Sequence, residues 1–298
     1  MSKNPLGDIR VGVGGWTFEP WRGVFYPKGL PQKRELEYAS GKLTAIEING
    51  TYYGTQKPES FRKWREETPD DFVFTLKGPR YATNRRVLAE AGESINRFFA
   101  SGVTELGDKL GPINWQFAAT KKFDREDFAR FLELLPKNIG ARLIRHAVEV
   151  RHESFRAKEF IDLAREHDVA IVVAGQSEFP LIADVTSSFV YVRVMGSSEK
   201  HKAGYPPADL DNWTSRARAW ASGGAPDDLP AIVPKSKAAL QRDVFLFMIS
   251  GFKQRNPAAA VALLQRLQEP APTAAPPKVR RAAPPASRAA PHNPGRGR

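Results

Sequence analysis

The chain has 298 residues, 41% of them hydrophobic, and its 45 lysine and arginine residues against 33 acidic ones give a formal net charge of +12. This length suits one large domain of the size of an α/β barrel, typically about 250 residues, and the lack of cysteine excludes disulfides, thiolate catalysis and cysteine-ligated metals. The sequence has neither an apolar run of membrane-spanning length nor a signal-peptide core, so we expect a cytoplasmic protein with no membrane partner.

Short, β-rich apolar runs recur along the chain and alternate with stretches of helical spacing. The runs are Ile9–Gly15, Thr44–Gly50, Phe72–Gly78, Gly111–Phe117, His146–Arg151, Val169–Gly175, Phe189–Met195 and Val244–Ser250. The helical stretches are Pro31–Lys42, Pro58–Thr68, Glu93–Leu110, Asp124–Leu135, Phe155–His167, Leu210–Ala221 and Pro257–Leu267. Eight strands that alternate with helices predict a single (β/α)8 TIM-barrel-like domain over residues 1–269, with an open doubly wound sheet as the alternative.

The last segment, residues 270–298, differs in composition from the rest. It is rich in proline, alanine and arginine, and its six lysine and arginine residues with no acidic residue supply half of the net charge. Such a segment has little to bury, so we expect a disordered basic tail. It is either a solubilising extension or a weak, salt-sensitive contact to nucleic acid.

Polar residues stand on alternate positions near the ends of at least five apolar runs. In Ala45–Asn49, for example, Ile46 and Ile48 share one face, so Glu47 and Asn49 face the barrel axis. The same alternation places further polar side chains at the end of the barrel where the carboxyl ends of the strands lie, which we call the carboxyl-end mouth. They are Lys77, Gln116, Glu149, Arg151 and Arg193. Two carboxylates and three cations leave surplus positive charge, which favours an anionic ligand. The alternative is an internal salt-bridge network of Glu47 with Lys77, and of Glu149 with Arg151 or Arg193.

The loop after the first run is rich in glycine and aromatic residues. Thr17 stands where a Gly-x-Gly-x-x-Gly fingerprint needs its last glycine, so Gly12, Gly14 and Gly15 do not predict dinucleotide binding. Four aromatic residues are either stacking platforms over the mouth or packing residues: Trp16, Trp21, Tyr52 and Tyr53.

An ordered series of motifs resembles the YecE-like family, a domain of unknown function (72). The motifs are Gly14-Gly15-Trp16, Trp21-x-Gly23-x-Phe25-Tyr26-Pro27, Glu47-Ile-Asn49-x-Thr51-Tyr52-Tyr53, Phe74-x-x-Lys77-x-Pro79, Gln116-Phe117, Glu149-x-Arg151-x-x-Ser154-Phe155 and Tyr191-Val-Arg193-x-x-Gly196. The resemblance implies a TIM-barrel-like fold and no established activity. This chain departs from the family pattern at Met195, where members usually carry histidine, and at Ile249-Ser250, where they usually carry asparagines.

We interpret the chain as an enzyme that uses acid–base or hydrolytic chemistry on an anionic, for example phosphorylated, small molecule. Glu47 and Glu149 are the expected catalytic residues, and Lys77, Arg151 and Arg193 the anion clamp. The other predicted substrate-binding residues are Asn49, Gln116, Trp16, Tyr52 and Gly196. A nucleic-acid-binding or nucleic-acid-processing protein and a non-catalytic metabolite-binding protein are the alternatives.

No cofactor is predicted, because the five histidines show no metal-binding spacing. Carboxylates alone leave a divalent cation as an option. The sequence does not determine the oligomeric state.

Overall fold

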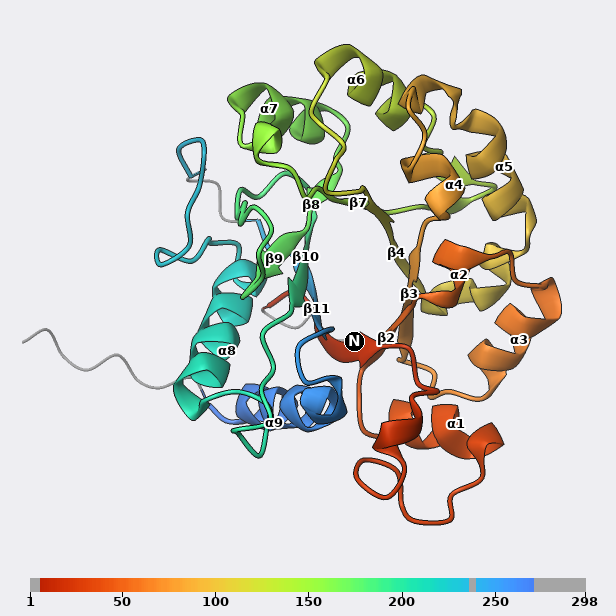
Figure 1. Ribbon diagram of the computed structural model, residues 1–298, viewed down its shortest axis with the longest axis vertical. Coiled ribbons are helices and arrows are strands. Elements are labelled where there is room, and N and C mark those ends of the chain that lie inside the picture. Colours follow the sequence, from red (N-terminus) through yellow and green to blue (C-terminus); the bar gives the residue numbers. More distant parts are fainter. Residues whose placement is uncertain (1–5, 236–239, 271–298) are drawn as a thin grey trace, which may run out of the picture.

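The computed structural model describes residues 6–235 and 240–270, and its strands form a ring with helices on the outside (Figure 1). The strands of the ring are β1 Ile9–Gly14, β2 Ala45–Ile48, β3 Val73–Lys77, β4 Leu110–Gln116, β7 His146–Glu149, β8 Ala170–Ile171, β9 Val173–Gly175, β10 Phe189–Val194 and β11 Asp243–Met248. All neighbouring strands pair in parallel, in the order β8-β7-β4-β3-β2-β1-β11-β10-β9.

The two ends of this order are halves of one predicted strand, which closes the ring. The sixth run, predicted over Val169–Gly175, is split at Val172 into β8, which pairs with β7, and β9, which pairs with β10. The amide of Val172 donates to the carbonyl of Val148 at 3.0 Å, so the chain stays attached to β7 through the break. The TIM-barrel-like fold is therefore confirmed, and the open sheet is wrong.

Helices connect the strands as the alternation predicted. They are α1 Glu35–Ser40, α2 Gly50–Tyr53, α3 Pro58–Glu66, α4 Arg80–Thr83, α5 Gly92–Ala100, α6 Arg125–Glu133, α7 Lys158–Glu166, α8 Pro207–Ala221 and α9 Asn256–Gln268. The single helix predicted over Glu93–Leu110 is in fact α5 followed by a 3₁₀ segment, Val103–Lys109, because Gly102 between them has a left-handed φ of 96°. The sequence also gave no sign of a small hairpin, β5 Asn138–Ile139 and β6 Arg142–Leu143, before β7.

Two separate apolar cores result from the strand alternation. The larger lies between strands and helices and includes outward-facing residues such as Val11, Ile46 and Val148. The smaller fills the barrel interior with residues such as Phe189, Phe245 and Phe247. The guanidinium of Arg145 lies 4.8 Å from the centre of the Phe245 ring. Aromatic side chains thus occupy the barrel below its carboxyl end, and the polar residues of the same strands lie above them.

In the described part of the chain, none of the helices has the length and apolarity needed to cross a membrane. The predicted disordered tail of residues 270–298 lies, from residue 271 on, outside the described ranges.

Candidate functional site

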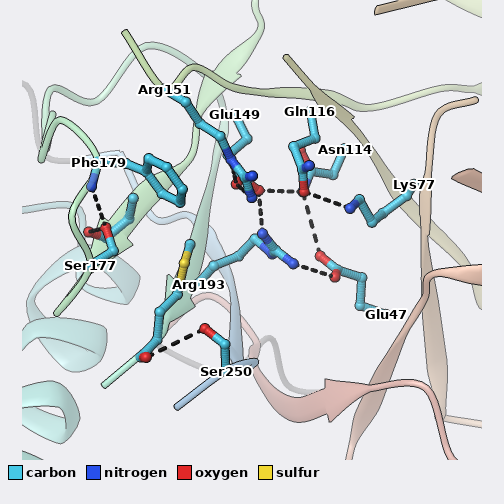
Figure 2. Close-up of polar contacts among 12 residues, drawn as sticks. Glu47, Lys77, Asn114, Gln116, Glu149, Arg151, Ser177, Phe179, Arg193 and Ser250 are labelled. Carbon is cyan, nitrogen blue, oxygen red and sulfur yellow. Dashed lines mark hydrogen bonds and ion pairs between the residues drawn. The ribbon is translucent and has the colours of Figure 1, made fainter. Parts of the chain in front are cut away.

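The carboxyl ends of five strands bring together the polar side chains that the alternation predicted (Figure 2). They are Glu47 on β2, Lys77 on β3, Gln116 on β4, Glu149 on β7 and Arg193 on β10, with Arg151 two residues beyond Glu149. All except Arg151 are buried. Parallel strands end on the same side of a barrel, which is why residues up to 146 positions apart meet here.

Arg193 joins the two carboxylates. Its Nη1 donates to Glu149 Oε2, and its Nη2 donates to Glu47 Oε1 at 3.1 Å. Both carboxylates have 0% exposed side chains and that of Arg193 is 3% exposed. Burial would lower the pKa of Arg193, but the two carboxylates outweigh it and raise that pKa above its ordinary value. The guanidinium therefore stays charged and fixes both acids in one geometry.

Each oxygen of Glu149 is occupied. Oε1 accepts from Arg151 Nε at 2.8 Å and from Arg151 Nη2 at 2.6 Å, while Oε2 accepts from Arg193 and from Asn114 Nδ2, the latter at 3.3 Å. Burial alone would raise the pKa of Glu149, but Arg193, Arg151 and Lys77 together lower it to about 2. Glu149 is consequently an anion at neutral pH, and each of its oxygens accepts two hydrogen bonds.

The second oxygen of Glu47 accepts hydrogen bonds from side chains inside the barrel. Its Oε2 accepts from the Tyr191 hydroxyl at 2.7 Å and from Asn114 Nδ2 at 3.5 Å, and the Tyr191 hydroxyl also contacts Thr75 Oγ1 at 2.9 Å. Burial, followed by the charge of Glu47, raises the pKa of Tyr191 well above its ordinary value, so the phenol stays a donor. Asn114, Thr75 and Tyr191 were not among the predicted site residues, although each lies an even number of positions from a predicted inward-facing residue of its own strand.

Within the part of the chain that the structure describes, Lys77 is the cation of the site that forms no ion pair with a carboxylate. The register explains this, because Glu47 lies beside Thr75 and Lys77 is therefore two residues closer to the carboxyl end than Glu47. Its Nζ donates to Gln116 Oε1 at 2.5 Å and lies 4.2 Å from the centre of the Tyr52 ring. Burial and the nearby charge of Arg193 lower the pKa of Lys77 to about 8. The Glu47–Lys77 salt bridge considered from the sequence is not formed, whereas both pairs considered for Glu149 are.

The loop after β9 supports Arg151 from one side. The guanidinium of Arg151 lies 4.2 Å from the centre of the Phe179 ring. Ser177 holds this loop, since its Oγ donates to the carbonyl of Ala174 at 3.0 Å and accepts from the amide of Phe179 at 3.2 Å (Figure 2). Sequence reasoning missed Phe179, because a loop residue has no periodicity to show which way its side chain points.

The remaining predicted site residues are divided between the mouth and its surroundings. Tyr52 contacts Lys77, as described, and Tyr53 beside it is exposed. Asn49 and Trp16 line a neighbouring cavity together. Trp21 is buried, and its indole nitrogen donates to the carbonyl of Lys253 at 2.9 Å, which makes it a packing residue.

Gly196 lies just beyond β10 against the loop that follows β9. A Cβ at Gly196 would stand 2.8 Å from Gln176 Cβ, so a larger residue would push this loop away. The two departures from the family pattern are neighbours, since Ser250 Oγ donates to the carbonyl of Met195 at 3.4 Å and the amide of Ile249 donates to Val194 at 2.9 Å.

Residues 6–235 and 240–270 contain no group of three or more His, Asp or Glu side chains that could hold a metal ion. The two carboxylates of the mouth are each bound to arginine instead.

Comparisons with a family model and with curated proteins agree with each other. The family model described as "Protein of unknown function DUF72" matches residues 10–283. The chain is similar to UPF0759 protein YecE of Escherichia coli K12, with 29% identity over 153 residues that cover 50% of this chain and 51% of the relative. It is also similar to UPF0759 protein YunF of Bacillus subtilis 168, with 24% identity over 52% of this chain and 54% of the relative. The matched region thus spans about half the length of these curated relatives.

Solved structures show the same fold. A DUF72 family protein from Thermotoga maritima MSB8 superposes with a TM-score of 0.67 at 23% identity, over 88% of this chain and 100% of that one. A DUF72 family protein from Enterococcus faecalis V583 gives a TM-score of 0.63 at 16% identity, over 87% and 94% of the two chains.

Proposed function

The chain belongs to the family of proteins of unknown function DUF72, and because a barrel fold hosts many chemistries, we propose a function from the mouth itself. We propose that the protein is an enzyme that binds an anionic, for example phosphorylated, small molecule at the carboxyl-end mouth. It would act on that molecule by acid–base or hydrolytic chemistry.

The observation that carries this proposal is the imbalance between donors and acceptors in the mouth. Both carboxylates already accept hydrogen bonds on each oxygen, as described above. Arg193 Nε is buried and, among the described residues, has no hydrogen-bond partner. Lys77 donates to a neutral amide and a ring rather than to a carboxylate. Asn114 Oδ1 is a buried acceptor of the mouth that, among the described residues, also has no partner. The spare donors nevertheless belong to cationic side chains and this spare acceptor to a neutral amide, so the site favours an anion over a cation.

The net charge of the mouth also favours an anionic ligand. Three cations, Lys77, Arg151 and Arg193, face two carboxylates, which leaves one positive charge in a buried environment. An uncompensated buried charge costs free energy, and the lowered pKa of Lys77 reflects that cost. A bound phosphate or carboxylate would supply the missing negative charge, with Lys77 and the partly exposed Arg151 as its first contacts.

The proton-transfer role predicted for Glu47 and Glu149 stays a prediction. Both carboxylates hold Arg193, and a pKa of about 2 makes Glu149 a weak base. Lys77, with a pKa of about 8, is matched to proton transfer near neutral pH. We therefore propose Lys77 as the first candidate for the general acid or base, with Gln116 and Asn49 orienting the substrate or stabilising a developing oxyanion.

The test is a thermal-shift and calorimetry screen of the full chain with inorganic phosphate, sugar phosphates and organic acids. A ligand at a hundred times its dissociation constant should add roughly 2.7 kcal/mol of stability. We expect Arg151→Ala to abolish this stabilisation. Arg156→Ala is the matched control, because Arg156 lies five residues after Arg151, has a 44% exposed side chain and, within the described ranges, forms its only ion pair with Glu153. Equal binding by the wild type and Arg151→Ala would overturn the proposal.

Turnover separates an enzyme from a non-catalytic metabolite-binding protein. Any ligand that binds is incubated with the protein and analysed by ³¹P NMR or mass spectrometry. New products that disappear in Lys77→Met support the enzyme, whereas ligand recovered unchanged supports a binding protein.

Nucleic-acid binding is a second candidate, which one surface feature favours. A cavity of about 570 Å³ beside the loop after β3 is lined by Arg80, Arg85 and Arg97 with a single acidic residue, Glu93. A phosphate backbone would suit this surface. Oligonucleotide affinity that falls steeply with salt, and that decreases in Arg80→Ala, would move this candidate to first place.

A further inference from the structure

A second cavity, of about 300 Å³, lies beside the mouth at the carboxyl ends of β1 and β2. Its lining includes the aromatic residues Trp16, Phe18 and Trp64 and the polar residues Thr17, Asn49, Gln56 and Lys253. We call this cavity the Trp16 pocket. The anion site described above leaves most of these residues without a role.

The aromatic residues build firm walls. The Trp16 and Trp64 rings meet edge to face with their centres 5.2 Å apart, and Trp16 also contacts Phe74 of the buried core. Trp16 and Trp64 are both only partly buried, so part of each ring is left to contact a ligand. Rings fixed in this way bind a flat partner with little loss of conformational entropy.

The polar residues of the pocket suit the edge of a heteroaromatic ring. Asn49 and Gln56 each carry an amide NH₂ group that donates and a carbonyl oxygen that accepts, the groups that pair with the ring nitrogens and exocyclic groups of a base. Lys253 adds a cation that lies 4.4 Å from the centre of the Phe18 ring and, among the described residues, forms no ion pair within 4.0 Å.

Asn49 connects the pocket to the mouth. It lines the pocket and follows Glu47 by two residues, and its Nδ2 contacts the carbonyl of Glu47 at 3.5 Å. The close approach of Asn49 to β1 requires glycine there, because a Cβ at Gly14 would stand 2.6 Å from Asn49 Nδ2. A ligand with a flat ring in the pocket and an anionic group in the mouth would therefore contact Asn49 at its centre.

We propose that the Trp16 pocket binds a nucleobase, so that the ligand of this protein is a nucleoside phosphate with its phosphate at Lys77 and Arg151. This inference rests on the proposed function, since it names the ligand class of the same mouth. A sugar phosphate without a base would occupy the mouth and leave the aromatic walls unused.

The experiment compares four probes by calorimetry on the full chain: adenosine monophosphate, uridine monophosphate, ribose 5-phosphate and adenosine. We expect at least one mononucleotide to bind about ten times more tightly than ribose 5-phosphate, because stacking on an aromatic side chain contributes that much or more. Trp16→Leu should remove this advantage and leave ribose 5-phosphate binding unchanged. Gln56→Ala, a milder change at a partly exposed residue, should reduce it several-fold.

Tyr38→Leu is the matched control, since Tyr38 is a partly buried aromatic residue on α1 that packs against Phe25 outside the pocket. Its nucleotide affinity should equal that of the wild type. Ribose 5-phosphate that binds as tightly as both mononucleotides would overturn the nucleobase pocket and leave the anion site standing. Adenosine that binds as tightly as its monophosphate, with no effect of Arg151→Ala, would instead overturn the anion site.

Discussion

Replacing Glu149 by glutamine tests whether the mouth depends on a buried ion network. The wild-type carboxylate accepts four N–H groups, from Arg151, Arg193 and Asn114. A glutamine keeps one oxygen and places an NH₂ group against donors on the other side. Two or more charge-assisted hydrogen bonds are lost, and two arginines lose their shared counter-charge. We expect the free energy of unfolding to fall by roughly 3–5 kcal/mol at neutral pH.

The assay is urea unfolding followed by tryptophan fluorescence, at neutral pH and in acid. The folded-state pKa of Glu149 is lowered from 4.5 to about 2, so its contribution is present above pH 4.5 and is lost as the pH falls toward 2. The difference between wild type and Glu149→Gln should therefore narrow over this window. This difference in unfolding free energy should be independent of pH if the carboxylate were not held by cations.

Glu153→Gln provides the control for Glu149→Gln, because Glu153 has a 72% exposed side chain and its ion pair with Arg156 measures 3.8 Å. Its unfolding free energy should stay within about 0.5 kcal/mol of wild type. A loss below about 1 kcal/mol in Glu149→Gln, or an equal loss in both variants, would refute the reasoning.

Three further changes probe other parts of the mouth. Tyr191→Phe removes the 2.7 Å hydrogen bond to Glu47 and should cost about 2 kcal/mol in urea unfolding; wild-type stability would contradict the role given to Tyr191. Phosphate affinity measured by calorimetry should fall as the pH rises through about 8, where Lys77 loses its proton, and a flat profile would show that Lys77 does not contact the anion. Gly14→Ala should displace Asn49 and weaken ligand binding several-fold, with a change of only about 1 kcal/mol in unfolding; unchanged affinity would separate Asn49 from the ligand.

The strand alternation was enough to place the polar residues of the mouth. Glu47 and Glu149 face the axis because their neighbours along each strand are apolar and pack under the helices. This is a local property, since side chains alternate along any strand. The break at Val172 was not visible in the same way, because a run of apolar residues does not show where its pairing partner changes from β7 to β10.

The partner of each acid was only partly visible in the sequence, because both pairs considered for Glu149 are formed, whereas the pair considered for Glu47 is not. Residue types allowed Glu47 to pair with Lys77. The register of β2 and β3, however, places Lys77 two residues closer to the carboxyl end of the barrel than Glu47, and Arg193 forms the bridge between the two acids. The pocket of Trp16 and Asn49 needed the same information, since it also contains Lys253 from the far end of the chain.

The sequence by itself determined the barrel and the face that carries the site, because both follow from short-range periodicity and from the shared direction of parallel strands. Only the tertiary structure decided which charges meet, which oxygens are saturated and which donors are left over. Those properties depend on strand register and burial, which arise from contacts between different strands, such as that of Glu47 on β2 with Arg193 on β10, 146 positions away.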